Sequence, residues 1–312
     1  VTFTNKAAEE IKKRVSLLTN TGNTIPWSGT FHSICSRILR KDGAKIGIPI
    51  SFVIYDSDDQ LSTIKQIAKD FGINIKQINP HAMLSSISQA KSELIGPEDY
   101  EVYAKGYFHK TTAKVYFEYN KRLRKADALD FDDLLFECVN LLRKEKEVLE
   151  KYQHTFKYIL VDEYQDTNKA QYELTKLLAK QHSNIFVVGD MSQAIYSFRG
   201  ADYRNILNFQ RDYPTAKIYN LEQNYRSTQT ILDAATNVIK NNTNNISLAL
   251  WTDKGVGEKI TVFGAQNEKD ESFYVCSQIE DLQSRGISLT DTAVLYRTNA
   301  QSRTIEEQLI RF

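Results

Sequence analysis

Short apolar runs alternate with amphipathic helical patterns along most of the chain. The strand-like runs are "VTFT", "YILVDE", "IFVVGD", "KIYNL" and "TAVLYRT". Between them, residues 6–18 and 168–180 place apolar side chains on one face at helical spacing, and Asn168 is a suitable N-cap for the second helix. Because strands alternate with helices, the pattern predicts an α/β fold with a largely parallel sheet.

A helical stretch interrupts this alternation between about residues 48 and 128. It predicts helices over 57–72, 79–96 and 107–126, with Ser57 and Asn79 as N-caps and Gly72 and Gly96 as helix ends. We therefore expect an all-helical insertion at 48–128 within a first domain formed by residues 1–47 and 129–222. That domain resumes with one helix over 128–152, and residues 223–312 begin a second domain.

Composition and charge fit a soluble globular protein, with 41% hydrophobic and 25% charged residues. The formal net charge is +1, so any nucleic-acid surface must be a local patch. Cys35, Cys138 and Cys276 form no CxxC pair, which argues against a zinc site or disulfides and fits a reducing, cytoplasmic location. No apolar run is long enough to predict a membrane span. Since the chain opens within a strand pattern and stops within a helical one, we expect a fragment.

Several predicted strands end in polar residues, and the carboxyl ends of parallel strands form one edge of a sheet. Asp162 and Glu163 follow one run, and Asp190 follows another. Taken singly, each is as readily a capping or surface residue. Together they suit phosphoryl transfer, in which one acid holds Mg²⁺ and its neighbour accepts a proton from water. Gln193 could then sense the γ-phosphate, and Arg226 could meet the charge of the transition state.

Seven segments occur in a fixed order along the chain. They are "VTFTNKAAEEI", "GTFHSICSRIL", "ALDFDDLL", "ILVDEYQDTN", "VVGDMSQAIYSFRGAD", "LEQNYRS" and "AVLYRTNAQSR". In this order they resemble the superfamily-one DNA helicases of the UvrD/PcrA/Rep type. The resemblance runs from Val1 to the C-terminus and implies two RecA-like domains of the P-loop NTPase fold, the second one truncated. It also implies that ATP binds between the domains and that single-stranded DNA crosses their tops.

The resemblance assigns roles to individual residues around ATP and Mg²⁺. Asp162 and Glu163 match the family's metal-binding and water-activating pair. Gln193 matches the residue that couples the γ-phosphate to DNA binding, Arg226 matches the arginine finger, and Tyr225 matches the residue that packs on the adenine. Family members move 3′ to 5′ on single-stranded DNA and unwind duplex DNA in repair or replication.

The DNA-binding candidates are aromatic residues for base stacking and small polar or basic residues for phosphates. Tyr196 and Phe198 would share a face if their segment were extended. Phe198 stands where the family often has Trp, so we expect weaker stacking there. Alone, each aromatic is more often a core residue. The full set is Phe3, Phe31, His32, Tyr196 and Phe198, with Thr2, Asn5, Thr30 and Ser33, and Arg297, Asn299 and Arg303 from the second domain.

No phosphate-binding loop of the form GxxxxGKS/T occurs in the 312 residues. Without its backbone N–H groups, lysine and hydroxyl, the isolated chain is expected to be inactive as an ATPase. We also expect its first sheet to lack a strand beside residues 159–163. Two alternatives remain open: a helicase subunit of a helicase–nuclease recombination complex, and a non-catalytic single-stranded-DNA-binding protein.

Overall fold

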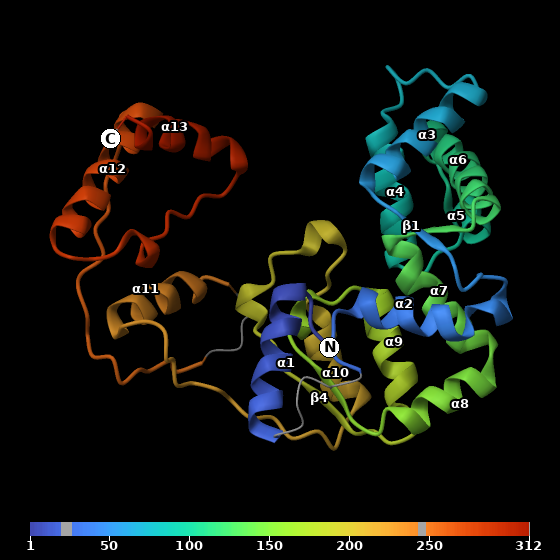
Figure 1. Ribbon diagram of the computed structural model, residues 1–312, viewed down its shortest axis with the longest axis horizontal. Helices are drawn as coiled ribbons and strands as arrows, with labels where there is room; N and C mark the ends of the chain where they lie inside the picture. The colour runs from blue at the N-terminus through green and yellow to red at the C-terminus, as the bar shows by residue number, and fades with distance from the viewer. Residues whose placement is uncertain (20–26, 243–247, 312) are drawn as a thin grey trace. The chain divides into compact units, whose positions relative to one another are not determined.

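The computed structural model describes residues 1–19, 27–242 and 248–311. Its contacts divide the chain into two compact units, Val1–Asn220 and, after it, Leu221–Asn241 with Leu248–Phe312 (Figure 1). Among the described residues, no helix is both long and apolar enough to cross a bilayer.

A small parallel sheet lies at the centre of the first unit. Strand β3 (Ile159–Val161) pairs in parallel with β4 (Ile185–Val187). Val1 lies along the other edge of β3, where its amino group donates to the Leu160 carbonyl at 2.7 Å. The Asp162 amide in turn donates to the Val1 carbonyl at 3.0 Å. Both edges of β3 are therefore occupied, so the prediction of a missing strand beside 159–163 is wrong; the described residues supply no strand to the outer edge of β4.

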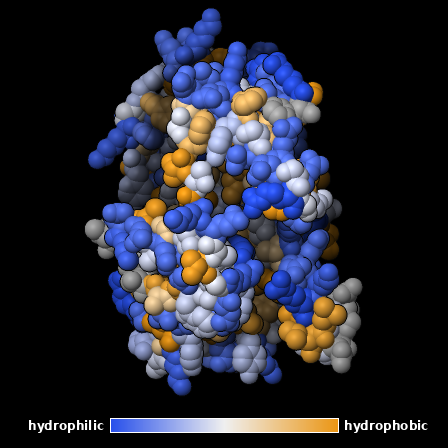
Figure 2. All heavy atoms as spheres, turned by 90° about the vertical axis from the view of Figure 1, so that its left-hand side faces the viewer, coloured by the Kyte–Doolittle hydropathy of each residue, from blue (hydrophilic) through white to orange (hydrophobic). Residues whose placement is uncertain are grey.

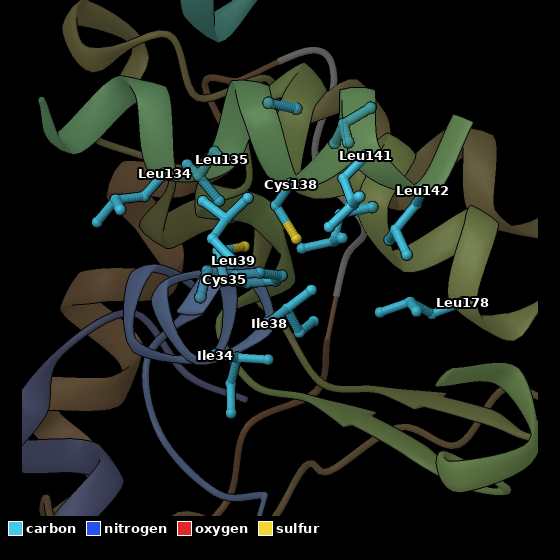
Figure 3. Packing of buried hydrophobic residues seen from close by; sticks show 14 of the residues in the cluster. Ile34, Cys35, Ile38, Leu39, Leu134, Leu135, Cys138, Leu141, Leu142 and Leu178 are labelled. Atoms are coloured by element: carbon cyan, nitrogen blue, oxygen red, sulfur yellow. The ribbon is translucent and has the colours of Figure 1, made fainter. Parts of the chain in front are cut away.

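Helices cover one face of this sheet and form the main core with it, whereas Leu160 and Phe186 on the other face are exposed. Helix α2 (Phe31–Asp42) packs against α7 (Phe131–Lys144), and Figure 3 shows side chains of the two helices pointing toward one another. Burial of each Leu or Ile side chain contributes about 1.5–3 kcal/mol, so this contact is a principal source of stability. The other α-helices of the first unit outside residues 48–128 are α1 (Asn5–Thr19), α8 (Lys146–Thr155), α9 (Lys169–Ala179) and α10 (Arg204–Asp212).

The predicted helices at 6–18 and 168–180 are confirmed as α1 and α9, and Asn168 caps α9 by accepting from the Gln171 amide at 2.9 Å. The single helix predicted over 128–152 is wrong. That stretch contains strand β2 (Ala128–Asp130), α7 and α8, and Glu145 separates the two helices with an extended backbone.

Four helices with their own core occupy most of residues 48–128. They are α3 (Ser57–Asp70), α4 (Pro80–Ser92), α5 (Pro97–Tyr103) and α6 (Gly106–Lys125), and they bury residues such as Ile64, Met83 and Tyr116. The stretch also contains β1 (Val53–Tyr55), which pairs in parallel with β2, so it is mainly rather than entirely helical.

The predicted helix boundaries in this stretch are partly corrected. Asn79 caps α4 as predicted, by accepting from the His81 amide. Asp56, rather than Ser57, caps α3, because its carboxylate accepts from two backbone amides of the first turn. Gly96 precedes α5 instead of ending α4.

The second unit contains α11 (Gln229–Ile239), α12 (Glu268–Ser284) and α13 (Asn299–Leu309), of which α12 and α13 pack together. The strands predicted at 217–221 and 292–298 do not form. Their apolar side chains are exposed, with Leu295 at 93%, and no described segment offers them a hydrogen-bonding ladder. Figure 2 shows hydrophobic side chains among the polar ones on the face that it presents.

Candidate functional site: the carboxyl ends of β3 and β4

The acid pair forms the turn that leaves β3. Asp162 is half-buried and its backbone is tied to Val1. Glu163 is exposed and adopts a left-handed backbone with φ 53° and ψ 45°. Such a conformation is uncommon for a residue other than glycine and costs on the order of 1 kcal/mol. The chain therefore bends sharply at this point, and the side chains of Asp162 and Glu163 leave the backbone in different directions.

Gln165 connects this turn to the end of β4. Its side chain is 1% exposed. Its Nε2 donates to Glu163 Oε2 at 2.8 Å, and its Oε1 accepts from the Asp190 amide at 3.0 Å. The close packing also explains Gly189, because a Cβ atom at that position would lie 2.7 Å from Gln165 Oε1.

The same network continues to Gln193. Asp190 caps the short 3₁₀ turn η3 (Met191–Gln193), where it accepts from the Ser192 amide at 2.9 Å and from Gln193 Nε2 at 2.8 Å. The structure thus joins Glu163 to Gln193 through Gln165 and Asp190. Gln165 is not among the predicted site residues; its only signal in the sequence is an amide two residues after the acid pair, in a segment too polar for a strand.

Asp166 borders the acid pair without a partner for one of its oxygens. It is 7% exposed, and Oδ1 accepts no hydrogen bond. Burial, with a smaller contribution from the Glu163 charge, raises the pKa of the Asp166 carboxyl to about 6. This carboxyl therefore gains a proton more readily than an ordinary aspartate.

The donor set at the end of β3 fits Mg²⁺ rather than a tightly caged metal. Among the described residues, no group of three or more His, Cys, Asp or Glu side chains is arranged to hold an ion. Mg²⁺ commonly binds one or two carboxylates and completes its shell with water and substrate phosphates. Asp162 and Glu163 are the residues that could hold it in this way.

Three aromatic side chains form a row close to this edge. The rings of Phe3 and Tyr196 stack with centroids 5.2 Å apart and planes at 28°, although 193 positions separate them in the sequence. Phe198 continues the row at 6.0 Å from Tyr196 and is 72% exposed. The segment is not extended, since Ser197–Arg199 forms a 3₁₀ turn, but the turn still brings both rings together.

A second aromatic pair lies where α2 and α7 begin. His32 and Phe131 meet edge to face with centroids 6.1 Å apart, and Phe131 is 50% exposed. Burial lowers the pKa of His32, so its imidazole is neutral at pH 7. Phe131 is not among the predicted DNA contacts, although its segment "ALDFDDLL" is one of the seven; the available signal was its apolar ring directly after a strand and within "DFDD".

Some predicted DNA contacts are buried instead. Phe31 is 4% exposed, because the first turn of α2 directs it into the main core. Thr30 is 8% exposed and caps α2 by accepting from the Ser33 amide. Thr2 is 1% exposed, with a hydroxyl that has no partner. These three side chains cannot offer a surface to DNA in this structure, whereas Asn5 and Ser33 are exposed.

The remaining predicted residues belong to the second unit. Tyr225 is 75% exposed and donates to Gln223 Oε1 at 2.8 Å. Arg226 is exposed, and its amide donates to Asn224 Oδ1. Three further candidates, Arg297, Asn299 and Arg303, are exposed at or near the start of α13. Arg303 forms an ion pair with Glu307 at 2.9 Å.

A shallow hollow on the first unit lies away from these residues. It has a volume of about 440 Å³ and is lined by residues 158–160 and 183–186, at the amino ends of β3 and β4. Leu160 and Phe186 are 59% and 58% exposed there. This apolar hollow therefore contributes nothing to the acid pair at the opposite ends of the strands.

Comparison with known proteins places the chain in a family. The UvrD/REP helicase N-terminal domain matches residues 1–214, and the UvrD-like helicase C-terminal domain matches residues 219–311. The chain belongs to the UvrD/REP helicase family, and its domains are accordingly of the RecA-like α/β type.

Curated relatives agree with this assignment. The chain is 50% identical over 312 residues to a protein named "ATP-dependent DNA helicase PcrA" from Bacillus subtilis (strain 168), and the match covers 100% of the chain and 42% of the relative. Proteins of the same name from Staphylococcus aureus (strain Mu50 / ATCC 700699) and Staphylococcus epidermidis (strain ATCC 35984 and synonyms) are 49% and 48% identical, each with 100% of the chain and 43% of the relative covered. The chain thus spans less than half the length of these relatives.

Proposed function

We propose that this chain forms part of a motor that hydrolyses ATP, moves 3′ to 5′ along single-stranded DNA and unwinds duplex DNA in repair or replication. One observation carries the proposal. Hydrogen bonds through Gln165 and Asp190 link Glu163 to Gln193, and Tyr196, three residues further along, stacks on Phe3. A carboxylate suited to water activation is thereby connected to an aromatic surface suited to unpaired bases.

The chemistry follows from the positions of the side chains. Glu163 accepts the proton of a water molecule that attacks the γ-phosphorus, while the bond from that phosphorus to the bridging oxygen of ADP breaks. Because Gln165 occupies Glu163 Oε2, the other carboxylate oxygen is left for the water. When bound with ATP, Mg²⁺ would neutralise phosphate charge, and Asp162 would hold it through water.

Gln193 and the residues of the second unit complete the assignment. Gln193 is exposed on the turn that Asp190 caps, so its amide can meet the γ-phosphate. We assign Arg226 to the negative charge that develops on the transferred group and Tyr225 to the adenine ring, on the basis of the family resemblance. Since the 312 residues include no GxxxxGKS/T loop, the isolated chain should not hydrolyse ATP.

Single-stranded DNA should lie against the two aromatic groups of the first unit. The first is the row of Phe3, Tyr196 and Phe198, and the second is the pair of His32 and Phe131. Stacking on exposed rings requires no base sequence, which suits a translocating motor.

Fluorescence anisotropy with a labelled oligothymidylate tests this surface on the 312-residue chain. Phe3→Ala and Tyr196→Ala should each weaken binding roughly 5- to 150-fold, the range that corresponds to about 1–3 kcal/mol per stacked base. The double variant should lose less than the sum, since the two rings support one another. Tyr107→Ala, which removes a 73% exposed ring from α6, is the control. Equal losses of affinity for Phe3→Ala, Tyr196→Ala and Tyr107→Ala would contradict the proposal.

A further inference from the structure

A fully buried ion cluster joins the helical stretch to the start of α7. Lys91, near the end of α4, has a side chain with 0% exposure. Its ammonium group lies 2.7 Å from Asp130 Oδ2 and 2.8 Å from Asp133 Oδ1. These acids are 39 and more positions away in sequence, so the cluster is a tertiary contact.

Aromatic groups enclose this cluster. The Tyr119 hydroxyl donates to Asp130 Oδ2 at 3.0 Å, and the Lys91 ammonium lies 5.0 Å from the centre of the Tyr119 ring. Burial opposes the charge on Lys91, but the two carboxylates outweigh it and raise the pKa of Lys91 above its ordinary value. Lys91 is therefore charged at neutral pH.

Stability alone does not account for such a cluster. Removing two or three charges from water is costly, and apolar residues of equal volume often stabilise a fold as well or better. What an ion cluster adds is a fixed geometry, because each of its hydrogen bonds sets the orientation of a particular carboxylate oxygen.

The orientation that Lys91 imposes is that of the α7 cap. Asp130 Oδ1 accepts from the Asp133 amide at 2.8 Å, and Asp133 Oδ2 accepts from the Asp130 amide at 3.1 Å. Each carboxylate thus uses one oxygen for the reciprocal cap and the other for Lys91. Phe131, the first residue of α7, lies between these two capping acids in sequence and meets His32.

We propose that Lys91 is a positioning residue for single-stranded DNA. By fixing both capping carboxylates, it sets the start of α7 so that the half-exposed Phe131 ring stands beside His32 as a stacking face. It also ties that face to α4, so a displacement of the helical stretch changes the stacking face. This inference rests on the proposed function, because it assumes that Phe131 contacts DNA.

A double-mutant cycle on the 312-residue chain tests the inference by oligothymidylate anisotropy. Phe131→Ala should weaken binding roughly 5- to 150-fold. Lys91→Met should weaken it at least threefold, yet add nothing further in the Phe131→Ala background, because its effect passes through that ring. Lys151→Met, which breaks the Lys151–Asp42 pair at 2.8 Å elsewhere in the unit, should leave affinity unchanged. Each variant is compared below its own thermal midpoint, measured by circular dichroism.

A milder variant covers the case in which Lys91→Met does not fold. Tyr119→Phe deletes only the hydroxyl that supports Asp130, and should weaken binding about twofold in the wild-type background and not at all with Phe131→Ala. Equal losses in both backgrounds, or no loss, would overturn the role of Lys91 while Phe3→Ala still supports the DNA surface. If neither Phe3→Ala nor Phe131→Ala weakens oligothymidylate binding, the proposed function itself is refuted.

Discussion

Replacement of Gln165 by leucine tests the hydrogen-bonded link at the ends of β3 and β4. Leucine keeps most of the buried volume but removes both polar atoms. The bond to the Glu163 carboxylate is charge-assisted, and loss of the second bond leaves the Asp190 amide without its acceptor. With about 1–2 kcal/mol for each loss, we expect the free energy of unfolding to fall by about 2–4 kcal/mol.

Amide hydrogen exchange locates the effect. Urea unfolding gives the global change, and exchange measured by NMR should show the Asp190 amide losing protection by about tenfold or more, since 1.4 kcal/mol corresponds to a factor of ten. Gln153→Leu is the matched control, because Gln153 is a buried glutamine whose Nε2 donates to the Leu177 carbonyl at 2.7 Å. If Asp190 stays protected in Gln165→Leu, or loses protection equally in Gln153→Leu, the reasoning about this link is refuted.

Three further predictions concern stability, each measured by urea unfolding. Asp166→Asn should stabilise the chain by about 1–2 kcal/mol at pH 8 and leave its stability unchanged at pH 4. The Asp166 carboxyl has a raised pKa of about 6 in the folded chain, so the stability that its protonated form contributes is lost as the pH rises through 6. A stabilisation that does not depend on pH would contradict this. Ile38→Ala, in the α2–α7 contact, should cost about 2–5 kcal/mol, against less than about 0.5 for Leu18→Ala at an 84% exposed site; similar costs would refute the assigned core. Thr30→Ala should cost about 1 kcal/mol through loss of the α2 cap, and no change would remove that role.

Local patterns predicted the elements that depend on local physics. Helices α1 and α9 follow from the spacing of their apolar residues, and the caps at Asn79 and Asn168 follow from short polar side chains before helical patterns. The pairing of β3 with β4 follows in the same way from two apolar runs joined by a helix.

Predictions failed where distant partners decide the outcome. Residues 292–298 have the composition of a strand, but a strand needs a ladder, and none is formed with the described residues. Phe31 belongs to a DNA-binding pattern, yet its place in the first turn of α2 directs it inward. Gln165 was not predicted as a site residue because its role depends on a hydrogen bond from the Asp190 amide, 25 positions away, which no local spacing reveals.

DNA-dependent ATP hydrolysis tests the central claim most directly. The 312-residue chain is compared with a longer polypeptide in which it is continued on both sides by the corresponding regions of the Bacillus subtilis relative. We predict background phosphate release from the chain alone, stimulation of the longer polypeptide by single-stranded DNA, and loss of that activity by about 100-fold or more in Glu163→Gln. Hydrolysis by the chain alone, or undiminished turnover in Glu163→Gln, would contradict the account.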